Sequence, residues 1–120
     1  MAYNQQLADK IREELMAETV VEEKKMFRGL SFMVNNKLCI SVGEEDAMFR
    51  IDPKVHDSLL EENGFCRTMT TKTREYKGYL LVDARGLQTK SDLLYWIHLA
   101  LAFNKEAKAA KKKTRAKTAS

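Results

Sequence analysis

Residues 24–35 read KKMFRGLSFMVN, and they contain the clearest β-structure signal in the chain. The apolar run Leu30–Val34 predicts a strand, and Gly29 before it favours a bend because glycine lacks a Cβ atom. Asn35-Asn36 follows as a two-residue turn, since asparagine tolerates positive φ. Residues 38–42 then alternate apolar and small side chains, which predicts an antiparallel partner for the first strand.

Helical patterns lie on both sides of this segment. Before it, apolar residues recur at helical spacing and predict an amphipathic helix over about residues 4–18. After a third strand at residues 47–51, Asp52-Pro53 begins a second helix, because aspartate caps free N–H groups and proline suits the first helical position. Asn63-Gly64 is expected to end that helix in a left-handed cap.

The remaining elements are a weaker β segment, a strand and a long helix. Residues 66–73 are polar and rich in threonine, which is typical of a loop or a weak edge strand, and residues 76–82 predict a strand. Thr89 begins a last helix that runs through Phe103 and is apolar over more than half of its circumference. Such a helix needs burial on two sides, against the sheet and against another helix or subunit.

The order of these elements is α-β-β-β-α-β-β-α, which predicts an α+β fold. The expected architecture has two layers, an antiparallel sheet with the helices packed on one face. The 120 residues fit one domain, which we place at residues 1–104, followed by a basic tail at residues 105–120. No apolar run approaches the roughly 20 residues of a membrane span, and no secretory signal is visible, so we expect a cytoplasmic chain without membrane contact.

The net charge of +4 comes from the tail. Residues 105–120 hold seven basic residues and one acidic residue, whereas the preceding 104 residues sum to −2. Such a segment buries too little apolar surface to order itself. It is either a solvated solubility tail or a weak, salt-dependent contact for nucleic acid, made by Lys111, Lys112, Lys113, Arg115 and Lys117.

Few residues suggest catalysis or metal binding. His56, His98, Cys39 and Cys66 have the composition of a zinc site, but no pair has the short spacing that structural sites use. We interpret both histidines as exposed helix residues and Cys39 as a strand residue of the core. No phosphate loop, nucleophile elbow or dinucleotide fingerprint is present, so we expect no enzyme, no cofactor and no metal.

The segment at residues 24–35, following a helix that opens MAY, resembles the TfoX N-terminal domain family (TfoX/Sxy), bacterial regulators of competence. Met48-Phe49-Arg50, Tyr76–Asp83 and Leu93–Phe103 agree with it, and the likeness spans about residues 1–104. It implies a small secretion-chaperone-like α+β domain that takes part in transcription regulation. Full-length members carry a second, helical domain, and the family has no established catalytic residues to transfer.

The leading hypothesis is a non-enzymatic regulatory or adaptor domain that binds a protein. By resemblance that partner is a transcription regulator, and a second copy of the chain is the alternative. Two other readings stay open, nucleic-acid association through the tail and an enzyme or small-molecule binder of unknown specificity. The candidate partner-binding residues combine basic, soft and aromatic side chains: Lys24, Lys25, Met26, Phe27, Arg28, Trp96 and Phe103.

Overall fold

The computed structural model describes residues 3–17, 20–26, 29–70 and 73–106, and these form three α-helices and six strands. Two short 3-10 turns, η1 and η2, precede α2 and α3. In chain order the elements are α1 (Gln5–Glu14), β1 (Val21–Met26), β2 (Gly29–Val34), β3 (Lys37–Val42), β4 (Asp46–Arg50), η1 (Pro53–Val55), α2 (His56–Glu62), β5 (Cys66–Thr70), β6 (Glu75–Asp83), η2 (Ala84–Leu87) and α3 (Lys90–Asn104).

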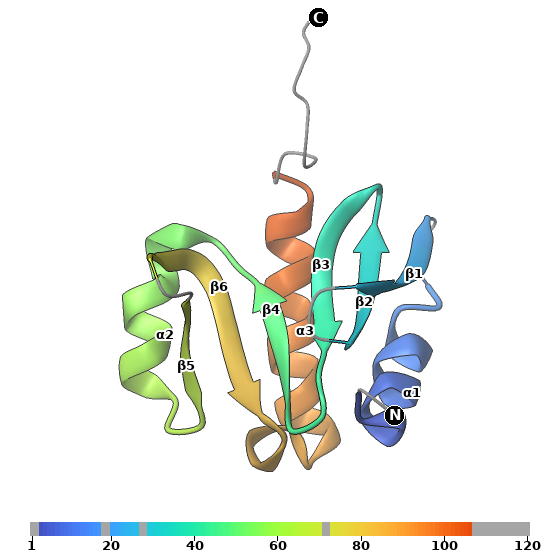
Figure 1. Cartoon of the computed structure of the whole chain (residues 1–120), viewed down its shortest axis with the longest axis horizontal. Coiled ribbons are helices and arrows are strands. Elements are labelled where there is room, and N and C mark those ends of the chain that lie inside the picture. The colour runs from blue at the N-terminus through green and yellow to red at the C-terminus, as the bar shows by residue number, and fades with distance from the viewer. Residues whose placement is uncertain (1–2, 18–19, 27–28, 71–72, 107–120) are drawn as a thin grey trace, which may run out of the picture.

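All six strands form one antiparallel sheet in the order β1-β2-β3-β4-β6-β5. Asn35 and Asn36 have φ values of 54° and 65°, as the predicted two-residue turn between β2 and β3 requires. In Figure 1, α3 lies behind β3 and β4. The predicted α+β class, with its antiparallel sheet and helices, is confirmed.

The sheet has one strand more than the sequence pattern indicates. Residues Val21–Met26, with the sequence VEEKKM, form β1 and pair with β2 along their whole length. The segment Cys66–Thr70, for which loop and edge strand were both open, is the edge strand β5. The charged strand β1 and the polar strand β5 therefore end the sheet on its two sides.

Side-chain caps mark the starts of α1, η1 and α3, while α2 follows η1 without a side-chain cap of its own. Asn4 Oδ1 accepts from the Leu7 N–H at 3.1 Å, Asp52 Oδ1 from the Lys54 N–H at 2.9 Å, and Thr89 Oγ1 from the Asp92 N–H at 3.0 Å. The predicted left-handed cap at Gly64 is wrong, because Gly78 is the single described glycine with positive φ. Instead the Asn63 N–H and side-chain amide both donate to the Leu59 carbonyl, at 3.1 and 2.9 Å, and this ends α2.

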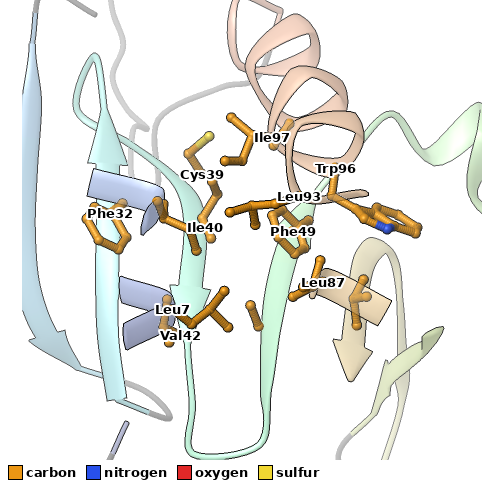
Figure 2. Packing of buried hydrophobic residues seen from close by; sticks show 14 of the residues in the cluster. Leu7, Phe32, Cys39, Ile40, Val42, Phe49, Leu87, Leu93, Trp96 and Ile97 are labelled. Atoms are coloured by element: carbon orange, nitrogen blue, oxygen red, sulfur yellow. The ribbon is translucent and has the colours of Figure 1, made fainter. Parts of the chain in front are cut away.

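The hydrophobic core lies between the sheet and the helices. Leu93, Trp96 and Ile97 of α3 point at the strands, where they meet side chains such as Phe49 and Ile40 (Figure 2). The helix also packs against α1, so its predicted burial on two sides is confirmed. Each fully buried side chain of this kind contributes about 1.5–3 kcal/mol.

Three hydrogen bonds of Asn104 join the end of α3 to the β2–β3 turn. Asn104 is buried, donates to the Val34 carbonyl at 3.1 Å and accepts from the Asn35 amide at 3.2 Å. The Lys37 ammonium donates to the Asn104 carbonyl at 3.0 Å. The asparagine turn is thereby held against the last helix, which fixes the position of the first hairpin.

Candidate functional site

The two faces of the sheet carry different side chains, because successive residues of a strand point to opposite faces. On the face covered by the helices, one residue from each strand forms a row across the sheet, which we call the covered row: Glu23, Phe32, Ile40, Phe49, Leu80 and Thr68. The residues next to these form a second row on the opposite face, which we call the open row: Lys24, Ser31, Ser41, Met48, Leu81 and Arg67.

The open row is buried at its centre although the described helices pack on the other face. Ser31, Ser41 and Met48 are at most 2% exposed, and Leu81 is 8% exposed. The Ser31 and Ser41 hydroxyls share a hydrogen bond at 3.1 Å. Met48 and Leu81 do not belong to the main core cluster. The centre of this row is therefore shielded from solvent, and the two serine hydroxyls there satisfy each other.

Each end of the open row carries a cation. Lys24 is exposed on β1, and among the described residues it forms no ion pair. At the other end the Arg67 guanidinium contacts the Asp46 carboxylate at 2.6 Å. The Asp46 side chain is 6% exposed and the Arg67 side chain 56%, so the arginine is anchored at its tip while one side stays in water.

The predicted partner-binding residues of the first hairpin fall into two groups. Lys24 and Lys25 are both exposed, Lys24 on the open face and Lys25 on the helix side of β1. Three of the predicted residues cannot be placed on either face. Phe27 and Arg28 lie outside the described residues, and so does the side chain of Met26. Met33, which shares the open face with Lys24, is half-buried. The structure thus places part of the predicted basic and methionine-rich segment on the open face.

The prediction that Trp96 anchors an interface needs correction. Its side chain is 3% exposed and lies against Phe49, with the ring centroids 5.9 Å apart, so it belongs to the core (Figure 2). The apolar stripe of α3 signalled burial correctly, but its sequence could not separate core from interface. Phe103 is half-buried, and the Arg50 guanidinium lies 5.7 Å from its ring and 5.4 Å from that of Tyr79.

His56 is buried, which corrects its interpretation as an exposed helix residue. It is 1% exposed, and its Nδ1 accepts from the Gly78 N–H at 2.9 Å. The proton must therefore reside on Nε2, which lies 2.9 Å from Thr68 Oγ1 and donates to it. Burial lowers the pKa of His56 and favours this neutral form. The ring joins α2 to β5 and β6, which is a structural role; its distant partners gave no signal in the local sequence.

The described side chains offer little for catalysis or metal binding. Within the described ranges, no three His, Cys, Asp or Glu side chains are grouped to hold a metal ion. Cys39 is buried, and burial raises the pKa of the half-buried Cys66 thiol, which disfavours the nucleophilic thiolate. His98 is exposed.

The surface hollows of the described part are small. One of about 200 Å³ lies between α1 and the start of α3, one of about 230 Å³ lies beside Phe65 and Trp96, and one of about 290 Å³ lies at the turn of residues 43–46. Small-molecule sites usually occupy about 300–1,000 Å³. These hollows therefore favour surface contacts over enclosure of a ligand.

Comparison with known families decides the membership of the chain. The model of the TfoX N-terminal domain matches residues 13–104. The chain belongs to the TfoX N-terminal domain family. This membership suggests a regulatory, competence-related role. No curated protein and no solved structure matched the chain.

The two remaining predictions concern the basic tail and the membrane. Lys111, Lys112, Lys113, Arg115 and Lys117 lie outside the described residues, as does most of the predicted tail. In the part that is described, none of the helices is long and apolar enough to cross a bilayer.

Proposed function

We propose that this TfoX N-terminal domain is a non-enzymatic regulatory domain that binds another protein through the open face of its sheet. The ends of the open row support this proposal most directly, because Lys24 is exposed at one end and the Arg67 side chain is 56% exposed at the other, whereas the centre of the row is buried. The partner that we propose is a transcription regulator, in keeping with the regulatory, competence-related role that the family suggests.

The electrostatics of the open face predict what it recognises. Lys24 at one end is exposed and unpaired among described residues, whereas Arg67 at the other end is already bound to Asp46. A partner with an acidic group opposite Lys24 would therefore gain more binding free energy from a contact with Lys24 than from a contact with Arg67. Rim charges of this kind mainly set the rate and specificity of association.

Quantitative co-purification from the native cells tests this proposal with two matched lysine variants. Lys24→Glu reverses the charge on the open face, and Lys10→Glu reverses an exposed charge on α1. We expect Lys24→Glu to reduce the recovered partner by about fivefold or more and Lys10→Glu to leave it unchanged. Equal recovery with wild type, Lys24→Glu and Met33→Asp would contradict a binding role for the open face.

A second candidate function, nucleic-acid association, rests on the composition of the tail. Its seven basic residues against one acid favour weak contacts with phosphate backbones. Duplex DNA is titrated with the intact chain and with a chain that lacks residues 106–120, at two salt concentrations. Affinity that falls with salt and with the deletion supports the candidate, and affinity that the deletion leaves unchanged removes it.

A further inference from the structure

The strand β1 ends the sheet, and its outer edge has no strand beside it among the described residues. Residues 22–25 of this strand are exposed. An edge strand presents unpaired N–H and C=O groups that can pair with another chain. Two exposed apolar side chains, Met16 at 78% and Val20 at 46%, occur just before it in the sequence. The region therefore combines free backbone hydrogen-bonding groups with exposed apolar surface.

The charge order of β1 is complementary to itself. The strand reads VEEKKM, with two acids followed by two bases, so an antiparallel second copy brings acids toward bases. A two-fold axis that relates such edge strands runs perpendicular to the sheet, and each face continues into the same face of the second copy. In an antiparallel pair, directly opposite residues have their side chains on the same face of the sheet. For two identical strands this requires one residue to lie opposite its own copy, on the two-fold axis.

A pairing centred on Glu23 satisfies the charges best. It places Glu22 opposite Lys24 of the second copy, twice by symmetry, on the open face. The two Glu23 side chains then meet on the helix side, but each is already bound by its own Arg12, with Nη2 2.8 Å from Oε1. This guanidinium also lowers the pKa of Glu23. Lys25 of the second copy is the diagonal neighbour of Glu23 and adds a further attraction.

The neighbouring register is less favourable. A pairing centred on Lys24 would place Glu23 opposite Lys25 of the second copy, also twice by symmetry, but it would bring the two Lys24 side chains together on the open face. Neither has an ion-pair partner among the described residues of its own chain to offset that repulsion. Like charges directly opposite each other destabilise a strand pair.

We propose that a second copy of this chain pairs with β1 in an antiparallel register centred on Glu23. The two sheets become continuous, and both open faces lie on one side of the dimer and both helix layers on the other. This inference goes beyond the proposed function, because a monomer could still bind a partner through its open face. The strand pair is small, so the dimer is expected to be weak, with appreciable association at about 0.1–1 mM.

Charge reversal tests the proposal on the full chain by sedimentation equilibrium. Glu22→Lys and Lys24→Glu each turn the Glu22–Lys24 contacts into like-charge pairs, and each should raise the dimer dissociation constant about tenfold or more. The double variant restores opposite charges in the Glu23-centred register and should return to within about threefold of wild type. Glu61→Lys on α2 is the matched control and should change nothing. Circular dichroism checks that each variant is folded.

Disulfide trapping provides a second readout that depends on the register. In a Cys66→Ser background, Glu23→Cys lies on the symmetry axis and should form a covalent dimer on mild oxidation, whereas Lys24→Cys should not. A wild-type chain that stays monomeric at about 1 mM overturns the proposal. So does a dimer that the double charge swap fails to rescue, or one that Lys24→Cys traps and Glu23→Cys does not.

Discussion

The covered row and the open row cross the same six strands, yet the open row carries serine at the two central positions where the covered row carries Phe32 and Ile40. The covered row places Phe32, Ile40, Phe49 and Leu80 under the helices, and all four are fully buried. The open row has two serines, a methionine and a leucine at the corresponding places. The difference shows that the large apolar side chains that hold the fold together lie on the covered face, while the open face has small buried hydroxyls at its centre and exposed cations at the ends of its row.

The largest loss of stability should follow from truncating a buried side chain of the covered row. Phe49→Ala removes a fully buried ring that packs on Trp96, and it should lower the free energy of unfolding by about 3–5 kcal/mol. Met33→Ala on the open face should cost less than about 1 kcal/mol. Urea unfolding measures both. Equal losses would show that the two faces do not differ in their contribution to stability.

The next effect concerns His56, which joins the second helix to the sheet on the covered side. His56→Ala leaves the Gly78 N–H without an acceptor and should cost about 2–3 kcal/mol, which thermal or urea unfolding measures at pH 8. A loss below about 0.5 kcal/mol would contradict a structural role for the ring.

The same histidine predicts a pH dependence. Because burial lowers the pKa of His56 below its ordinary value of 6.5, the unfolded chain binds a proton more readily than the folded chain. Its contribution to stability is complete above pH 6.5 and falls as the pH drops from there toward the lower folded pKa. Asp57 and Glu75 oppose this shift and Lys77 adds to it. Wild type should lose more stability than His56→Ala between pH 7.5 and about 5, and parallel pH profiles would contradict the assignment.

Glycine substitutions give a smaller contrast. Gly78 has a φ of 92°, and an added Cβ would meet the Ile51 carbonyl oxygen at 3.0 Å and Pro53 Cγ at 3.1 Å. Gly78→Ala should therefore cost about 1–2 kcal/mol. Gly64→Ala is the matched control, since a Cβ there meets nothing within 4 Å and the residue needs no positive φ. Equal stability of the two variants would show that the backbone at Gly78 is not constrained.

The smallest effect should come from the centre of the open row. Ser31→Ala leaves the Ser41 hydroxyl without its partner and should cost about 1 kcal/mol. The double change to alanine removes both hydroxyls and should cost less than about 0.5 kcal/mol. Equilibrium unfolding of the four chains in this cycle gives both values. A large loss in the double variant would mean that the open face also holds the fold together.

The sequence predicts those features that depend on neighbouring residues. The Asn35-Asn36 turn and the caps at Asp52 and Thr89 follow from local backbone chemistry, and the structure confirms them. The sequence pattern does not predict β1 as a separate strand, because a charged edge strand lacks the apolar alternation of a half-buried one.

Features that depend on distant contacts could not be read from the sequence. The burial of His56 rests on Gly78 and Thr68, which lie 22 and 12 residues away. Likewise, the split between a buried Trp96 and a half-buried Phe103 depends on where the strands lie beneath α3. The open row also requires the register of five strand pairs, so its residues could be assembled only from the folded chain.

Photo-crosslinking in the native cells tests the central claim most directly, namely that the open face is the contact surface. A benzophenone amino acid is placed at Lys24 or Met33 on the open face, and at Tyr95 or His98 on the exposed side of α3. We expect adducts with another protein from Lys24 and Met33 and none from Tyr95 and His98. Adducts from the α3 positions alone, with none from the open face, would contradict it.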